Sequence, residues 1–433
     1  MATRLRIVHQ RDLSERDRAA LFDRQQPLEE VMLSVRSILR RVQAEGDAAL
    51  RRYTRRFDGA RLMELEVSAE DLEAAHDAAD PGLREALEAT IAAVRAFHQT
   101  QKPDGKPVET APGVRVWREW RPIERVGLYV PGGRGAYPSS VVMLGVPAIL
   151  AGCREIVLCT PPNADGSAPA ATLLAAWLVG IKRFFKLGGA QAIAAMAYGT
   201  ESVPRVDKIF GAGNPYVTAA KLLVFPQVAL DVPAGPSELL IVAEEGASPV
   251  WIAADLLSDV EHGPDSPAVL ITTSLELARL VAFEVERQLA ELPRQDVARM
   301  ALEAHGLIVV VDTLDQAAAL ADEYAPEHLE LMTREPGKLL ERIHNAGSIF
   351  LGMYAPNAAG DYATGTNHVL PTARFARTFG PVSVEDFGRL VQCQQVSREG
   401  LASLRPTVER LARVEGLEGH ARSVAARFSG EPT

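Results

Sequence analysis

Cysteine is scarce in this sequence, and its scarcity excludes several classes of protein. The 433 residues contain three cysteines, Cys153, Cys159 and Cys393, which are too few for a disulfide framework and lack the paired spacing of a zinc knuckle. No apolar run approaches the roughly 18 residues that a membrane-spanning helix needs. The first residues also lack the apolar core of a signal peptide. We therefore expect a protein of the reducing cytoplasm that does not act in a membrane.

An excess of positive charge is also missing. The formal net charge is -10 and the isoelectric point is near 5.5, which argues against nucleic acid or an anionic membrane as the main partner. Apolar residues make up 47% of the chain and charged residues 24%, which is ordinary for a globular protein. Because 433 residues exceed what one core usually supports, we expect two or more domains.

The pattern of apolar residues changes after about residue 100. Up to that point apolar positions recur at helical spacing, whereas from residue 126 short β-rich runs alternate with Ala-rich, helix-like segments. The expected strands are 126–129, 156–160, 184–187, 208–210, 239–243, 269–273, 307–312 and 349–351. Among the helices between them, one has a typical start at Ser248 and Pro249. This alternation indicates βαβ units and parallel sheets.

The predicted fold is therefore α/β. It has two incomplete Rossmann-like parallel-sheet domains, a helical N-terminal segment and a helical C-terminal arm. We expect residues 1–26 to form the N-terminal arm, 27–125 with 239–382 a first α/β domain, 126–238 a second α/β domain, and 383–433 the C-terminal arm.

A carboxylate and an imidazole stand side by side at Glu327 and His328, in a turn that closes a predicted helix. Histidine has a reference pKa of about 6.5, so this pair can supply a base and an acid near neutral pH. The alternative is a solvated surface pair, because such dipeptides are common. A role of this pair in proton transfer therefore depends on further polar groups lying around it.

Other acidic and imidazole side chains could provide such groups. Asp259 and His262 are three residues apart on a predicted helix, so they share one face and suit two ligands of one metal. They also fit an ordinary helix end, where a histidine meets the carbonyl groups. Asp361, in a glycine-broken loop, is a third candidate ligand. Glu415 and His420, in the tail, either complete a zinc shell or lie on a solvated face.

Glycine-rich turns follow several of the expected strands. Residues 129–133, 188–191 and 211–214 could let the backbone approach a ligand and expose helix N–H groups to phosphate. None matches the GxGxxG fingerprint with its acidic residue at the proper distance. Ordinary tight turns explain these glycines equally well, so a dinucleotide site stays open at this point.

Eight segments together resemble histidinol dehydrogenase, and they occur in order over nearly the whole chain. They are GLYVPGG (127–133), GGAQAIAA (188–195), KIFGAGN (208–214), DVPAGPSE (231–238), EHGPDS (261–266), YAPEHLEL (324–331), GDYATGTNHVLPT (360–372) and GLEGHARSV (416–424). The resemblance implies a zinc-dependent enzyme of histidine biosynthesis. Such an enzyme oxidises L-histidinol to L-histidine, by way of the aldehyde, with two NAD.

The resemblance also implies a role for individual residues. His328 would take the alcohol proton, and Glu327 would activate the water that hydrates the aldehyde. The implied zinc ligands are Asp259, His262, Asp361 and His420; the implied substrate contacts are Ser237, Asp259, His262, His328, Asp361, Glu415 and His420; and the implied NAD contacts are Tyr129, Gln191 and Asn214. In this family the tail crosses to the partner subunit. Residues 383–433 would then be a dimerisation arm, and a homodimer would share its active sites.

One implied ligand departs from the family pattern. Position 259 is usually glutamine in histidinol dehydrogenases and is Asp259 here. A carboxylate can bind zinc, but with Asp361 it would bring the formal charge of the metal shell to zero. Asp259 is either a tolerated substitution or the mark of a related zinc- and NAD-dependent dehydrogenase of another small polar alcohol, such as a sulfonated diol. A zinc hydrolase with Glu327 as base is an alternative of a different class. A non-enzymatic binding module is a further alternative.

Overall fold

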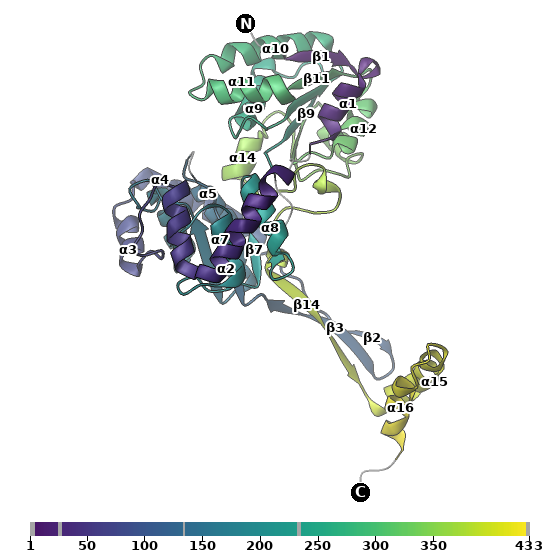
Figure 1. Cartoon of the computed structure of the whole chain (residues 1–433). Helices are drawn as coiled ribbons and strands as arrows, with labels where there is room; N and C mark the ends of the chain where they lie inside the picture. Colours follow the sequence, from purple (N-terminus) through teal and green to yellow (C-terminus); the bar gives the residue numbers. More distant parts are fainter. Residues whose placement is uncertain (1–4, 25–27, 133–134, 232–234, 430–433) are drawn as a thin grey trace. The chain divides into compact units, whose positions relative to one another are not determined.

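The chain folds into two compact units. The computed structural model describes residues 5–24, 28–132, 135–231 and 235–429. The larger unit comprises Met1–Gln101 with Ile123–Phe387, and the smaller unit comprises Lys102–Pro122 with Gly388–Thr433. Two parallel sheets with their covering helices lie in the larger unit, so the predicted α/β class is confirmed (Figure 1).

A six-stranded sheet forms one half of the larger unit. Its strands are β1 (Arg6–His9), β9 (Leu239–Ala243), β10 (Ala268–Thr272), β11 (Leu307–Val310), β12 (His328–Met332) and β13 (Ser348–Leu351). They run parallel in the order β1-β11-β10-β9-β12-β13. Every residue of β9, β10, β11 and β12 is buried. Such burial on both faces is typical of parallel sheets covered by helices.

Helices cover both faces of this sheet. The first face carries α9 (Pro249–Val260), α10 (Leu275–Leu289) and α11 (Gln295–His305). The second carries α1 (Glu15–Phe22), α12 (Leu314–Tyr324) and α13 (Pro336–Leu340). Helix α9 starts as predicted, with the Ser248 side chain accepting a hydrogen bond from the Trp251 N–H and Pro249 as the first helical residue. A short helix, α14 (Asn357–Tyr362), follows β13.

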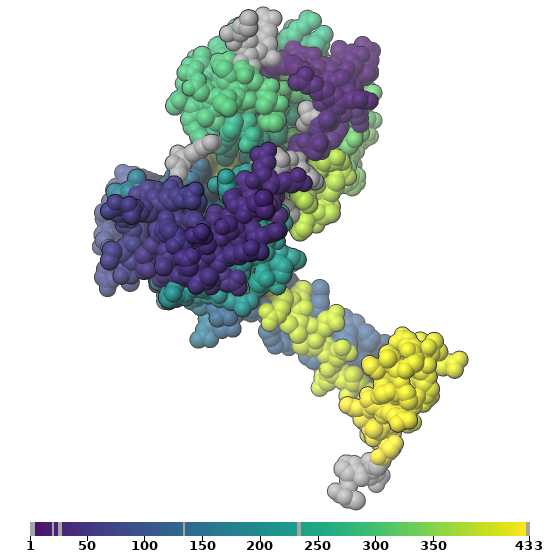
Figure 2. Space-filling view, viewed as in Figure 1, coloured from purple at the N-terminus to yellow at the C-terminus, as the bar shows by residue number. Residues whose placement is uncertain are grey.

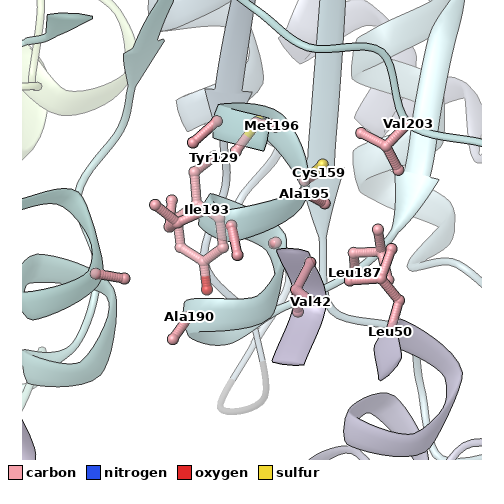
Figure 3. Packing of buried hydrophobic residues seen from close by; sticks show 14 of the residues in the cluster. Val42, Leu50, Tyr129, Cys159, Leu187, Ala190, Ile193, Ala195, Met196 and Val203 are labelled. Carbon is pink, nitrogen blue, oxygen red and sulfur yellow. The ribbon is translucent and has the colours of Figure 1, made fainter. Parts of the chain in front are cut away.

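A five-stranded parallel sheet forms the other half. Its strands, in the order β6-β5-β4-β7-β8, are β6 (Arg183–Lys186), β5 (Glu155–Thr160), β4 (Arg125–Tyr129), β7 (Lys208–Phe210) and β8 (Ala229–Leu230). One face packs against α2 (Glu29–Phe57), α7 (Gly189–Tyr198) and α8 (Pro215–Val224). Val42 and Leu50 of α2 lie among the buried side chains of this core, as do Ile193 and Ala195 of α7 (Figure 3). The remaining helices are α3 (Ala69–Asp77), α4 (Pro81–His98), α5 (Pro138–Ala151) and α6 (Ala170–Val179).

The smaller unit combines an antiparallel sheet with two helices. Its strands are β2 (Val108–Ala111), β3 (Val114–Pro122) and β14 (Gly388–Val396), in the order β14-β3-β2. Helices α15 (Arg398–Val414) and α16 (Glu418–Ala425) pack on each other and form one compact body (yellow in Figure 2).

All eight predicted strands are present, with ends shifted by at most two residues. Other expectations need correction. The predicted helical N-terminal arm also contains β1, an edge strand of the six-stranded sheet, and the predicted helical tail also contains β14, which precedes α15 and α16. Residues 27–125 were assigned to the same domain as 239–382, but α2 buries its apolar face against the five-stranded sheet. An amphipathic pattern shows which face of a helix is buried, but it does not identify the sheet that buries it.

A buried carboxylate fixes a kink in α2. Gly46 has a φ of 52° and interrupts the helix, and the N–H of Asp47 donates to the Glu201 carboxylate at 2.8 Å. The Asp47 carboxylate accepts hydrogen bonds from Thr200 Oγ1 (2.7 Å) and from the hydroxyl of Ser202. Burial by itself raises the pKa of Asp47, but these hydrogen bonds outweigh it and lower the pKa. The charged side chain therefore ties α2 to the loop that follows α7.

Replacing this carboxylate should destabilise the larger unit. Asp47→Ala leaves the Thr200 and Ser202 hydroxyls without their acceptor, so we expect the free energy of unfolding to fall by about 2–4 kcal/mol. Chemical denaturation measures the change. Glu45→Ala, which removes an exposed carboxylate of the same helix, should leave the unfolding midpoint nearly unchanged. Equal midpoints for the two variants would contradict a structural role for Asp47.

Candidate active site

The predicted site residues of the larger unit come together around two cavities. One cavity, of about 520 Å³, lies where the amino ends of β9 and β12 meet loops that follow β4 and β7. The predicted site residues that line it are Tyr129, Asn214, Ser237, His262, Glu327, His328 and Asp361. The second cavity, of about 810 Å³, shares Tyr129 and Asn214 with the first and adds Gln191. The predicted catalytic residues and the predicted NAD contacts thus line neighbouring cavities.

The turn before β12 places Glu327 and His328 in the interior. Helix α12 ends at Tyr324, and Ala325 adopts a left-handed conformation with a φ of 52°. His328 is then the first residue of β12, which lies between β9 and β13. Both side chains are buried, with 6% of Glu327 and 4% of His328 exposed. The alternative of a solvated surface pair is therefore wrong.

The backbone of Glu238 holds this pair. Its N–H donates to Glu327 Oε2 at 2.9 Å, and its carbonyl accepts the N–H of His328 at 3.1 Å. The same carbonyl lies 3.2 Å from His328 Nδ1, which assigns the ring proton to Nδ1. In the neutral ring the lone pair is then on His328 Nε2, which lies 3.6 Å from Asp361 Oδ1 and has no hydrogen-bond partner among the described residues. Nε2 is the atom of the ring that can accept a proton from a ligand.

A buried ion pair holds Glu238 in turn. The Arg24 guanidinium pairs with the Glu238 carboxylate, which also accepts the N–H of Ala373 at 2.9 Å. Arg24 also donates to the carbonyl of Tyr324, and its guanidinium lies 3.6 Å from the centre of that ring. The sequence analysis missed both Arg24 and Glu238. An acidic residue immediately before a fully apolar strand was the available signal for Glu238.

The electrostatics of the pair favour proton transfer. Burial raises the pKa of Glu327 to about 8, with the Asp259 and Glu238 carboxylates adding to the rise and His328 opposing it. Burial by itself lowers the pKa of His328, but the carboxylates of Glu327, Asp361 and Asp259 outweigh it and raise the pKa to about 10. Raised values of this kind belong to groups that keep a proton until a nearby charge changes.

The candidate metal ligands of the larger unit surround this pair. Asp259 is fully buried on α9; its Oδ1 accepts the Ser237 hydroxyl at 2.7 Å, and its Oδ2 has no partner in the described part of the chain. His262 follows α9 and turns Nδ1 to the carbonyl of Asp259 at 2.9 Å, so its Nε2 remains for a ligand. Asp361 lies in α14, a short helix, and not in the predicted loop. Burial raises the pKa of Asp259.

The two predicted site residues of the tail, Glu415 and His420, belong to the smaller unit. Glu415 follows α15 and His420 lies in α16, and both are exposed on the smaller unit. Within the described ranges there is no group of three or more His, Cys, Asp or Glu side chains placed to hold a metal ion. The orphaned oxygen of Asp259 and the facing imidazole of His262 nevertheless form a donor set that suits zinc.

The predicted nucleotide contacts lie at the carboxyl ends of the five-stranded sheet. The Tyr129 hydroxyl accepts the N–H of Gly189 at 3.1 Å, and the Asn214 side chain caps α8 by accepting the N–H groups of Tyr216 and Val217. Gly211 has a φ of 117°, and a Cβ there would lie 2.0 Å from the Tyr129 carbonyl oxygen. Gln191 is buried on α7, and its Oε1 has no partner in the described ranges. This edge follows the general rule for ligand sites in open α/β sheets.

The comparisons with known proteins agree on one family. The family model described as histidinol dehydrogenase matches residues 22–428. The chain is 51% identical over 424 residues to histidinol dehydrogenase of Xanthomonas euvesicatoria pv. vesicatoria, covering 96% of this chain and 98% of that one. It is 48% identical to the enzyme of Aliivibrio fischeri, covering 92% and 90%.

A solved structure shares the same fold. The crystal structure of histidinol dehydrogenase from Elizabethkingia anophelis matches with a TM-score of 0.93 and 41% identity, over 98% of each chain. No helix in the described ranges has the length and apolar character to cross a membrane. The family match over residues 22–428 and the relatives at about half identity lead to one conclusion: this chain belongs to the histidinol dehydrogenase family.

Proposed function

We propose that this chain oxidises L-histidinol to L-histidine, by way of L-histidinal, with two NAD, as the last step of histidine biosynthesis. The observation that carries the proposal is the buried Glu327–His328 pair, with His328 Nε2 turned to Asp361 beside a 520 Å³ cavity. The neighbouring 810 Å³ cavity supplies room for a nucleotide. A cytoplasmic enzyme is in keeping with three free cysteines.

The proton steps would fall to His328 and Glu327. With Nδ1–H directed at the Glu238 carbonyl, Nε2 of a neutral His328 accepts the alcohol proton as hydride leaves for the nicotinamide. Glu327, as a carboxylate, takes a proton from the water that adds to the aldehyde. His328 would again accept the hydroxyl proton as the hydrate gives up the second hydride, which would leave the carboxylic acid product. Keeping these groups buried protects the reactive aldehyde from bulk solvent.

Zinc would be held by Asp259, His262 and Asp361 of one subunit and His420 of its partner. The buried, unpartnered Oδ2 of Asp259 supports this ligand set. Bound zinc supplies a Lewis acid that anchors and polarises the amino alcohol without any change of oxidation state. Ser237, which donates to Asp259 Oδ1, would orient that ligand and contact substrate. Glu415 of the partner would meet the substrate as well, so the proposed unit of function is a homodimer.

Tyr129, Gln191 and Asn214 would contact NAD at the carboxyl edge of the five-stranded sheet. The start of α7, where the N-cap residue Gly188 makes no side-chain hydrogen bond, would provide backbone N–H groups for its phosphates. NADH formation at 340 nm on mixing zinc-loaded protein, NAD and L-histidinol tests the whole proposal. Two NADH for each histidinol are expected. A zinc hydrolase would form none, and a dehydrogenase of another alcohol would respond to that alcohol instead.

His328→Asn should lower turnover with L-histidinol by about 10²–10⁴, because the alcohol loses its proton acceptor. Zinc content should stay at the wild-type level, since His328 is not among the proposed ligands. Steady-state kinetics with metal analysis measures both quantities. Unchanged turnover would remove His328 from the mechanism.

Glu327 should give the aldehyde step its pH dependence. Because the pKa of Glu327 is raised to about 8, its base form increases as the pH rises through that value. We expect NADH formation from L-histidinal to increase between pH 7 and 9 in the wild type. Glu327→Gln should lower that rate by about 10²-fold and remove the increase. A variant that keeps the wild-type pH profile would show that another group activates water.

Sharing of sites between subunits can be tested by complementation. His328→Asn and His420→Asn disable opposite parts of a shared site, so each homodimer should be nearly inactive. In randomly mixed dimers, about a quarter of all sites combine intact residues from both chains. Co-expression with two different tags should therefore restore about a quarter of wild-type activity. Activity that does not exceed that of the separate variants would place His420 in the site of its own subunit.

A further inference from the structure

Strand β12 carries a second buried acid for which the proposed mechanism has no use. Glu330 lies two residues after His328, so both side chains project from the same face of the sheet, towards α9. Its neighbours Leu329 and Leu331 face the other way and pack in the core formed with α12. Glu330 is fully buried. A buried carboxyl group is costly unless it is paired or hydrogen-bonded, so its contacts matter.

Glu330 contacts two different helices. Its Oε1 accepts the backbone N–H of Asn357, the first residue of α14, at 2.7 Å. On its other side is the carboxyl group of Asp255, on α9. Burial first, and Asp255 second, raise the pKa of Glu330 well above its usual value. A raised pKa favours the protonated carboxyl group; its Oε2 has no hydrogen-bond partner in the described ranges and is the atom that can donate to Asp255.

A second link joins α14 to α9. The Ser258 hydroxyl lies 3.1 Å from Asn357 Oδ1 and 2.8 Å from the carbonyl of Asp255. Ser258 immediately precedes Asp259. At the other end of α14, Gly360 packs so closely on Phe350 that a Cβ would lie 2.5 Å from its ring. The start and the end of this short helix are therefore both fixed by direct contacts.

These contacts determine where the proposed metal ligands lie. Helix α14 carries Asp361, helix α9 carries Asp259, and His262 follows α9 directly. Asp361 Oδ1 also lies 3.6 Å from Nε2 of His328, on the strand that carries Glu330. Strand β12, helix α9 and helix α14 are therefore joined by Glu330 and the residues that it contacts. Displacement of the start of α14 would move Asp361 away from both His328 and Asp259.

We propose that Glu330 is a positioning residue that holds the start of α14 against β12 and α9, and so sets Asp361 in register with His328 and Asp259. The proposal rests on the proposed zinc-dependent function. It assigns Glu330 no contact with substrate, metal or nucleotide. Its effect passes through hydrogen bonds to Asn357 and Asp255, and the negative charge of a glutamate is not required.

Two substitutions separate the hydrogen bonds from the charge. Glu330→Gln keeps an oxygen for the Asn357 N–H and an amide donor for Asp255, whereas Glu330→Leu keeps neither. We expect Glu330→Leu to weaken zinc binding by about 10- to 100-fold, the range for residues that orient metal ligands. Glu330→Gln should stay within about threefold of wild type. Chelator competition measures zinc affinity, and kcat and KM for L-histidinol are determined on the same samples.

A control and a milder variant keep the result interpretable. Asp47→Ala removes a buried carboxylate from α2 and should lower the unfolding midpoint while leaving zinc affinity unchanged. Should Glu330→Leu fail to fold, Ser258→Ala cuts the second link to α14 without altering charge. It should weaken zinc binding by severalfold. Zinc binding is measured without substrate, so this test stands even if wild-type protein does not oxidise histidinol.

Three results would overturn the proposal. The first is wild-type zinc affinity in Glu330→Leu, or in Ser258→Ala where that variant replaces it. The second is a loss in Glu330→Gln as large as in Glu330→Leu, which would mean that the charge matters. The third is an equal loss of zinc affinity in Asp47→Ala, which would reduce the effect to general stability.

Discussion

The parallel pairing of β9 with β12 is the constraint on which the site depends. Leu239 and His328 are partners in register, so the residues before β9 lie beside the residues that begin β12. The backbone of Glu238 thereby reaches Glu327 on one side and His328 on the other. A shift of one residue in this register would turn every side chain of β12 to the opposite face of the sheet. His328 would then point into the core formed with α12.

The two sheets contribute opposite edges to the site. The five-stranded sheet presents its carboxyl ends, where α/β proteins usually bind ligands, and these ends carry Tyr129 and the turn at Gly211. The six-stranded sheet presents its amino ends, which carry Ser237, Glu238 and Glu327. The usual position of ligand sites in open α/β sheets therefore accounts for the predicted NAD contacts and not for the catalytic pair. Helix α9 also ends at this edge, which brings Asp259 and His262 to it.

An excess of buried acid gives the site its chemical character. Four acids are buried close to His328: Glu238, Asp259, Glu327 and Glu330. In the described ranges Arg24 forms an ion pair with Glu238 and with none of the other three. Burial raises the pKa of each of these acids. A site of this kind favours a bound cation, because a positive charge among carboxylates offsets their mutual repulsion. The same carboxylates raise the pKa of His328, so the ring keeps its proton until a bound cation offsets their charge.

The sequence by itself determined much of the local structure. Runs of three to six residues between helical segments located the strands, and Ser248 with Pro249 located the start of α9. Motifs around Glu327 and Asp361 indicated the family, which the comparisons confirmed. Strand β12 was not predicted, because its sequence, HLELM, includes a histidine and an acid at positions that are buried. Only the tertiary structure decided that α2 covers the five-stranded sheet, that Arg24 pairs with Glu238, and that Glu330 holds the start of α14. Periodicity indicates that one face of a helix or strand is buried. Which element covers that face is determined by contacts between residues far apart in the sequence.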